Sequence, residues 1–296
     1  MRGPVAEAIR QLKDSPMKPV ARTLRSLVWL LLPLSVGAHA AGTSFVDGLD
    51  AFDSSRWTRT HGVAAPDPID VGWRSTHVSF GSGEMSLRLN TWPCSVAQEQ
   101  CAGQPNASGQ LVSNDSYGFG TYSATFRAAS GAGVVTDFMK YSGTLNAATG
   151  PTDLIGMHIA GNDTSTLFVS YLSSTAGLTT QSIALGFDAS AGMHTYAFSW
   201  VAGSLSWSVD GQSVHTLSGV DVPDEQGRIV ADVWAVESGS ATSVLGSYVR
   251  GGATATFDSI SYTAVSPVPE PAPMAMLFAG LGVLGWQQRR RGRTSA

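Results

Sequence analysis

Apolar side chains recur at every second position along much of this chain, and a period of two is the pattern of a β-strand with one buried face. Phe198 and Trp200 alternate in this way, and a similar stretch at 205–209 follows after a short break. Asp210–Gly211 then supplies the residue types that a two-residue hairpin turn prefers. Repeated strands and turns of this kind predict an all-β sandwich of two antiparallel sheets, with Trp200 and Trp207 in its core.

The central part of the chain, residues 41–265, is predicted to form this sandwich as a single domain, because no repeat or Pro-rich linker divides it. Only 14% of the 296 residues are charged, against about 25% in an average soluble protein. Between residues 41 and 266 there are eight basic and 19 acidic residues, so that span carries 8 − 19 = −11. A surface of this sign repels phosphate backbones, which excludes nucleic acid as the expected partner.

The N-terminal residues 1–40 have the order of a secretory signal peptide. A basic stretch ends at Arg25, an apolar run covers 27–34, and Ala38-His39-Ala40 follows as a cleavage site for signal peptidase. Met17 is an alternative start that would leave a compact signal. An N-terminal anchor helix is the other interpretation, although the apolar run is short for a membrane span.

The C-terminal residues 266–296 carry a second targeting pattern. Pro269-Glu270-Pro271 precedes an apolar run of 13 residues at 274–286, and an arginine cluster begins at Arg289. The run is shorter than the roughly 20 residues that span a bilayer. This tail resembles the PEP-CTERM sorting signal of Gram-negative bacteria. The resemblance implies a short hydrophobic helix, processing by an exosortase, display or release outside the inner membrane, and an association with exopolysaccharide and biofilm. A simple tail anchor is the alternative.

Cys94 and Cys101 are the chain's two cysteines, and they lie in the part that is predicted to be exported. Oxidation is permitted there, so we expect a local disulfide that holds one loop, with two free thiols as the alternative. No histidine or acidic cluster stands beside them to complete a metal site.

The sandwich region contains four specific sequence motifs, at 117–122, 185–190, 194–200 and 207–211. In these motifs it resembles glycoside hydrolase family 16, and within that family the lichenase-type bacterial β-1,3-1,4-glucanases. The resemblance implies a concanavalin A-like jelly roll whose concave face binds a polysaccharide, either a β-glucan or an exopolysaccharide.

The catalytic strand departs from the pattern of that family, which is Asp-Glu-Ile-Asp-Ile-Glu-Phe before a Gly-x-Asp-Thr turn. The turn is present at 161–164, but the strand at 153–159 reads Asp-Leu-Ile-Gly-Met-His-Ile. Leu154 stands where the family has its nucleophile, Gly156 where it has an auxiliary aspartate, and His158 where it has the acid/base. A retaining mechanism needs two carboxyl groups, so no catalytic residue is assigned.

Three further expectations concern the cleft. No two acidic residues between 41 and 266 are two positions apart, so a relocated carboxylate pair would have to be brought together by folding. No Ser-His-Asp constellation is apparent, although His158 has a side chain that can protonate a leaving group. Tyr141 and Trp234 remain at cleft positions, where each ring either stacks on a sugar or fills the cleft floor.

A structural Ca²⁺ is implied by the same resemblance, on the convex side. Gly48, Gly83 and Asp258 fall at the matching places, and hard oxygen ligands suit this ion. No cofactor is expected for catalysis.

Three hypotheses for function follow. The first is an exported, non-catalytic polysaccharide-binding protein with a family 16 fold. The second is an active glycoside hydrolase that uses unusual groups such as His158. The third is a structural matrix protein without glycan affinity. A fold alone does not confer activity, and the missing carboxylates favour the first.

Overall fold

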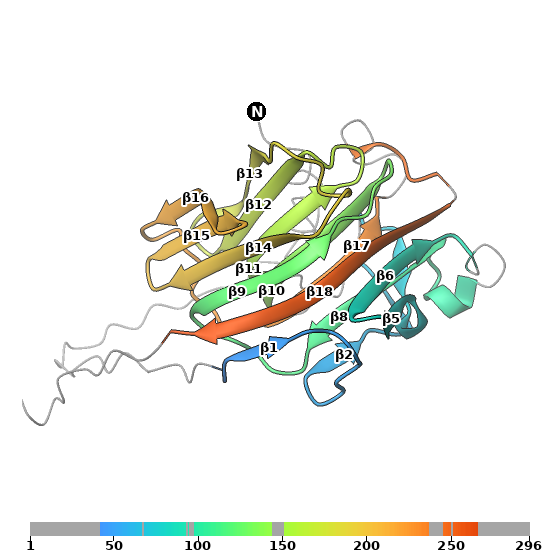
Figure 1. Ribbon diagram of the computed structural model, residues 1–296, viewed down its shortest axis with the longest axis horizontal. Helices are drawn as coiled ribbons and strands as arrows, with labels where there is room; N and C mark the ends of the chain where they lie inside the picture. Colours follow the sequence, from blue (N-terminus) through green and yellow to red (C-terminus); the bar gives the residue numbers. More distant parts are fainter. Residues whose placement is uncertain are drawn as a thin grey trace, which may run out of the picture. The chain divides into compact units, whose positions relative to one another are not determined.

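The computed structural model describes residues 42–66, 68–92, 94, 98–143, 151–236, 245–249 and 251–265. Regular structure in these ranges is almost entirely β and forms two stacked sheets (Figure 1), as the period of two predicts. Two short 3₁₀ turns, η1 (Ser75–His77) and η2 (Gln98–Cys101), lie in the connections. The predicted signal peptide at 1–40 and sorting signal at 266–296 lie outside the described residues.

The larger sheet has, within those ranges, the strand order β16-β15-β14-β9-β18-β6-β7-β4-β3, with β1 paired to β18 and β5 to β6. Neighbouring strands run antiparallel, apart from the parallel pair β4 and β7. The strands of this sheet are β1 (Phe45–Asp47), β3 (Val63–Ala64), β4 (Val71–Trp73), β5 (Val78–Gly81), β6 (Glu84–Asn90), β7 (Asn106–Ser108), β9 (Gly120–Arg127), β14 (His194–Val201), β15 (Ser204–Val209), β16 (Gln212–Ser218) and β18 (Gly252–Ala264).

The smaller sheet has the order β13-β12-β11-β10-β17-β8-β2, and its strand pairs are antiparallel. Its strands are β2 (Trp57–Arg59), β8 (Gln110–Ser113), β10 (Val134–Gly143), β11 (Pro151–Ala160), β12 (Thr166–Ser173), β13 (Gly177–Ala184) and β17 (Arg228–Ala235).

The space between the sheets is filled by aromatic side chains from alternate strand positions. Phe126 stacks on Tyr196 and on Phe257, with ring centroids 4.3 and 4.8 Å apart. Trp200 and Trp207 are fully buried, which confirms their prediction as core residues. Offset and edge-to-face aromatic pairs of this kind stabilise a core beyond the area that they bury.

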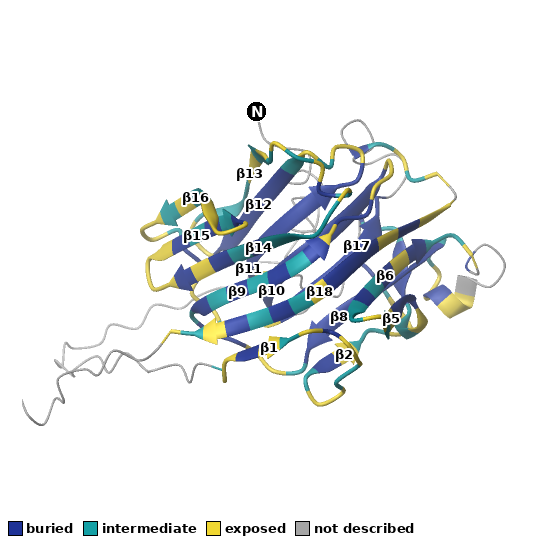
Figure 2. Ribbon diagram, in the orientation of Figure 1, coloured by how far each residue is buried: buried dark blue, intermediate teal, exposed yellow. Residues whose placement is uncertain are grey.

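The two sheets differ in how burial varies along their strands. Along β9 of the larger sheet, buried and half-buried residues alternate, so one face packs inward and the other faces outward (Figure 2). Along β11 of the smaller sheet every residue from 153 to 160 is buried, and β10, β12 and β17 are similar (Figure 2). Strands β10, β11, β12 and β17 of the smaller sheet are therefore buried on both faces, and the second face carries the predicted cleft residues.

The turn at Asp210–Gly211 joins β15 to β16 as the sequence predicts. Both residues have positive φ, 48° and 78°. A two-residue turn with left-handed backbone at both positions matches the twist of the strands that it connects.

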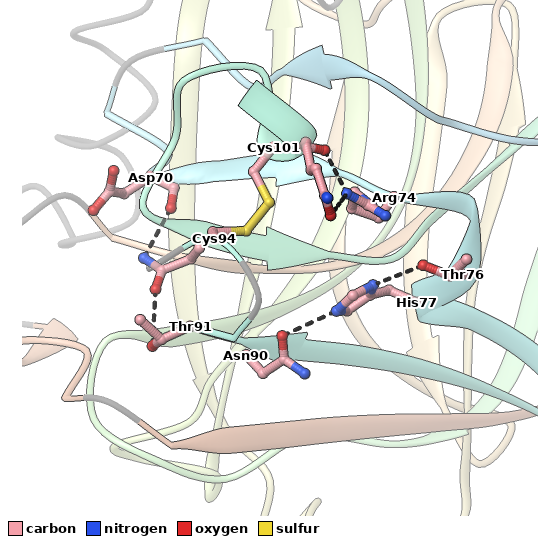
Figure 3. The surroundings of a disulfide bond; sticks show 10 residues. Asp70, Arg74, Thr76, His77, Asn90, Thr91, Cys94 and Cys101 are labelled. Carbon is pink, nitrogen blue, oxygen red and sulfur yellow. Dashed lines mark hydrogen bonds between the residues drawn. A yellow bond between two sulfur atoms is a disulfide. The ribbon is translucent and has the colours of Figure 1, made fainter. Parts of the chain in front are cut away.

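A disulfide between Cys94 and Cys101 closes the loop that leads to β7 (Figure 3). Arg74 Nη1 donates a hydrogen bond of 2.7 Å to the carbonyl of Gln100, within η2. A Cβ on Gly72 of β4 would lie 2.0 Å from the carbonyl oxygen of Cys101, so glycine is required for this close approach. The disulfide loop therefore packs directly on β4.

Within the part of the chain that the structure describes, no helix is long and apolar enough to cross a membrane.

Candidate functional site

The three positions at which the family pattern expects carboxylates lie on one face of β11. Leu154, Gly156 and His158 share that face, because side chains alternate along a strand. Ile155 and Met157, on the opposite face, pack into the core between the sheets. The strand geometry expected for a catalytic strand is therefore present, with different side chains on it.

The end of this face near Leu154 is apolar. Leu154 pairs with Tyr141 of β10 and with Leu172 of β12 in the strand register. These side chains belong to one cluster of buried apolar residues, whose members are Val112, Met139, Tyr141, Leu154, Leu172 and Val230. The position predicted for a nucleophile thus lies in a buried, largely apolar environment.

The end of this face near His158 is polar. The register places four side chains in one row across four strands, in the order Gln110 of β8, Asp232 of β17, Asp137 of β10 and His158 of β11. All four are buried, with exposed fractions between 1% and 4%. This row was not foreseen from the sequence, which assigned only His158 to the site.

A hydrogen-bonded chain joins Asp137 and His158 of that row to Trp234 and Ser170. Asp137 Oδ1 lies 2.8 Å from His158 Nδ1, and its Oδ2 accepts a bond of 2.7 Å from Trp234 Nε1. The other imidazole nitrogen, His158 Nε2, contacts the hydroxyl of Ser170 on β12 at 2.5 Å. The structure therefore brings together a Ser-His-Asp arrangement where the sequence showed none. Ser170 has no exposed surface, so its hydroxyl is a buried partner of the imidazole and not an exposed nucleophile.

Gly156 makes room for the imidazole. A Cβ at Gly156 would lie 2.6 Å from His158 Nε2, 2.7 Å from its Cε1 and 3.1 Å from Ser170 Oγ. A side chain at this position would push the imidazole away from Ser170. The glycine that replaces the expected auxiliary aspartate is thus a requirement of the new arrangement as well as a lost carboxylate.

Asp232 is the least satisfied polar group of the row. Its Oδ2 accepts a hydrogen bond of 2.9 Å from Gln110 Nε2, and its Oδ1 is buried without a hydrogen-bond partner among the described residues. Burial and the nearby charge of Asp137 raise the pKa of Asp232 well above the usual range of a carboxyl group. The surroundings of Asp232 therefore favour the protonated form of its carboxyl group.

Alternation along the strands would have revealed both aspartates. Asp137 is four residues before Tyr141 on β10, and Asp232 is two residues before Trp234 on β17, so each shares a face with a predicted cleft aromatic. A search within single strands missed them because they lie opposite one another on neighbouring strands. The rings of Tyr141 and Trp234 are themselves buried, and their contact with a sugar stays a prediction.

The predicted calcium residues lie near one end of β1. A Cβ on Gly48 or on Gly83 would lie within 3.2–3.5 Å of the carboxylate of Asp50, which the sequence analysis did not single out. Asp258 is two residues before Ile260, which pairs with Asp47 of β1. No group of three acidic, histidine or cysteine side chains converges among the described residues. A calcium ion here would thus depend on backbone carbonyls, and the site stays a prediction.

Comparison with known proteins identifies the domain. The model of the family described as glycosyl hydrolases family 16 matches residues 66–249. The chain belongs to glycosyl hydrolase family 16. A β-glucanase of Paenibacillus polymyxa is 33% identical over 77% of this chain and 91% of its own length, and one of Bacillus licheniformis gives the same values.

Solved structures of family 16 agree with the fold. A β-1,3-1,4-glucanase (lichenase) from a mouse hindgut metagenome is 27% identical with a TM-score of 0.67, covering 75% of this chain and 100% of that one. The β-glucanase of Bacillus licheniformis is 29% identical with a TM-score of 0.67, covering 76% of this chain and 99% of its own. The two sheets described above are thus the lichenase jelly roll.

A second family model, the PEP-CTERM protein-sorting motif, matches residues 267–291. This confirms the interpretation of the tail as a sorting signal. The motif implies export and an extracellular or cell-surface location.

The chemistry that this site supports differs from that of a family 16 catalytic strand. Leucine has no nucleophilic atom. The apolar cluster around it would also disfavour a charged group at this position. The polar row contains Asp232, a buried acid with a raised pKa, and an imidazole that is oriented by Asp137. These groups can donate protons and hydrogen bonds, but they all lie at one end of the face.

Proposed function

We propose that this exported protein binds polysaccharide through its family 16 domain without hydrolysing it. The observation that carries the proposal is the apolar cluster at the nucleophile position. A retaining glycosidase needs one carboxylate to attack the anomeric carbon and a second carboxyl group to protonate the leaving oxygen. Leu154, buried among Tyr141, Met139 and Leu172, offers no attacking group and no solvation for one.

The polysaccharide part of the proposal is supported by the family and by the location. The relatives described above are β-glucanases, so a β-glucan is one candidate ligand. The sorting motif supports removal of the tail by an exosortase, after signal peptidase has cleaved near residue 40. An exported glycan-binding protein of this kind would act on the exopolysaccharide or biofilm matrix of its own cell.

The experiment measures binding and cleavage in parallel. The full chain is incubated with mixed-linkage β-glucan, laminarin and the producing cell's exopolysaccharide. Binding is followed by depletion of the protein from solution, and cleavage by release of reducing ends. Saturable binding to at least one glycan without reducing-end release is the expected result. Absence of binding to all three contradicts the proposal and favours a matrix scaffold without glycan affinity.

A matched variant tests whether the cleft face is responsible for binding. Tyr141→Leu removes the aromatic ring but keeps an apolar side chain within the cluster. We expect weaker binding by a variant that keeps its native circular dichroism at the temperature of the assay, although the loss of a buried ring will lower its thermal midpoint. Unchanged binding would place the glycan elsewhere on the molecule.

Hydrolysis with unusual groups is the second candidate, and the polar row specifically favours it. The pKa of Asp232 is raised, one of its oxygens has no hydrogen-bond partner among the described residues, and His158 lies in the same row. If the unmodified protein releases reducing ends, the double variant Asp232→Asn/His158→Gln decides their source. Loss of the release in that variant would replace the binding proposal with this one.

A further inference from the structure

A lysine and an aspartate meet inside the sandwich, away from the cleft face. Lys140 of β10 and Asp153 of β11 have exposed fractions of 0% and 2%. Lys140 Nζ contacts Asp153 Oδ1 and lies 4.4 Å from the centre of the Trp200 ring. Burying two opposite charges is a weak source of stability, because the cost of desolvation offsets their attraction. The placement of this pair therefore calls for another explanation.

The second oxygen of Asp153 is held by the backbone. Oδ2 accepts hydrogen bonds from the N–H groups of Asp224, at 2.9 Å, and Glu225, at 3.2 Å. Two N–H groups that point at one oxygen polarise the carboxyl carbon and stabilise negative charge on that oxygen, as an oxyanion hole does. Pro223, which precedes Asp224, is held as well, because Trp200 Nε1 donates a hydrogen bond of 2.7 Å to its carbonyl.

Burial also favours the uncharged forms of both side chains. It lowers the pKa of the Lys140 ammonium and raises the pKa of the Asp153 carboxyl, although the two charges partly oppose these shifts. Moving one proton from Nζ to Oδ1 gives a neutral amine beside a carboxylic acid. These are the two forms that condense to an amide.

We propose that Lys140 and Asp153 join through an isopeptide bond that the folded protein forms by itself. The Nζ lone pair attacks Cγ of Asp153, and the oxyanion develops on Oδ2, between the two backbone N–H groups. A further proton moves from Nζ to Oδ1, the Cγ–Oδ1 bond breaks, and water leaves. One ammonium and one carboxylate thus become one secondary amide and one water, with no change of oxidation state.

The fold supplies what this condensation needs. Holding two reactants in contact replaces a bimolecular encounter, and effective molarities of about 10⁵–10⁸ M are reached in well-oriented pairs. The product removes two buried charges, and its carbonyl keeps both backbone donors. The bond would link β10 to β11 and is independent of what the cleft binds.

Tryptic digestion gives a direct test on the full chain. Lys140 is the single lysine or arginine between Arg127 and Arg228, so an unlinked chain yields the separate peptides 128–140 and 141–228. Trypsin does not cleave after a lysine whose amine is an amide. We expect the reduced, digested protein to yield peptide 128–228, lighter than its sequence mass by one water, with branched fragment ions that join positions 140 and 153.

Two results would overturn the proposal. One is release of peptide 128–140 as the main product from protein that has kept its native circular dichroism. The other is peptide 128–228 at its full mass, which is merely a missed cleavage. A succinimide elsewhere would lose the same water but would leave Lys140 cleavable.

Two variants serve as controls. Lys140→Arg keeps the positive charge and the tryptic site but cannot condense, so we expect cleavage after position 140. Asp153→Asn can still condense, with loss of ammonia, and it should give the same linked peptide as the parent protein. A peptide 128–228 that is lighter by one water in Lys140→Arg as well would overturn the proposal, because this peptide contains no other lysine.

Discussion

At the scale of single residues, the polar end of the candidate site is one interdependent network. His158, Gly156, Ser170 and Asp137 depend on one another: the aspartate and the hydroxyl take the two imidazole nitrogens, and the glycine provides the space. A buried polar network of this type is stable only when each member has its partner. Restoring a single carboxylate in the cleft would therefore disrupt the network without recreating a catalytic site.

A double-mutant cycle measures this dependence. Gly156→Ala places a methyl group 2.6 Å from His158 Nε2, and overpacking of this kind costs about 1–3 kcal/mol in the free energy of unfolding. In a His158→Ala background the clash is absent, so the same substitution should cost less than about 0.5 kcal/mol. Urea unfolding of the four proteins provides the measurement. Equal costs in both backgrounds would show that the imidazole does not occupy this space.

Asp232 predicts a pH dependence of stability. Because its pKa is raised in the folded protein, the unfolded chain releases this proton at a lower pH than the folded protein does. The contribution of Asp232 to stability therefore falls as pH rises above the ordinary carboxyl pKa of about 3.9. Asp232→Asn keeps an acceptor for Gln110 but does not titrate.

We expect Asp232→Asn to be at least as stable as the parent protein at about pH 8. The free energy of unfolding of the variant should also fall less than that of the parent protein between about pH 5 and about pH 8. Urea midpoints at the two pH values test this. A parallel decline in both proteins would assign the pH dependence to other groups.

At the scale of elements, the disulfide loop stabilises the edge of the larger sheet. Cys94 and Cys101 are seven residues apart, and the loop that they close lies against Gly72 of β4. By the chain-entropy relation, a loop of this length contributes about 2–3 kcal/mol to the free energy of unfolding.

The double variant Cys94→Ser/Cys101→Ser should therefore lower the free energy of unfolding by about 2 kcal/mol. The backbone amides of β4 and β7 should lose the most protection against exchange. Hydrogen–deuterium exchange measures this protection strand by strand. Reduction of the unmodified protein by dithiothreitol is the matched control. A loss spread evenly over both sheets would contradict a local role for this loop.

At the scale of the whole molecule, the predicted calcium site would link the start of the domain to its last strand. If backbone carbonyls near Gly48 and Gly83 bind the ion together with Asp258, calcium will stabilise the folded protein by mass action. The gain is about 2.7 kcal/mol when free calcium is about 100 times Kd. Thermal unfolding with added calcium and with EDTA measures it.

Asp258→Asn should abolish the difference between the two conditions, and Asp50→Asn should reduce it, because Asp50 lies beside both glycines. Identical thermal midpoints of the parent protein in calcium and in EDTA would contradict the predicted calcium site.

The sequence by itself determined the features that depend on local chemistry. A period of two predicted the strands, Asp210–Gly211 predicted its hairpin, and the Pro-Glu-Pro tail predicted a sorting signal. The replaced residues 154, 156 and 158 were also readable, since they lie on one strand and alternation places them on one face.

Only the tertiary structure decided which groups meet. Asp137, Asp232 and Ser170 come from three strands, and Gln110 and Asp232 are 122 residues apart in the chain. Lys140 and Asp153 likewise meet through the pairing of β10 with β11. Such contacts are set by the register between strands, which follows from the packing of the whole sandwich and leaves no mark on any single segment.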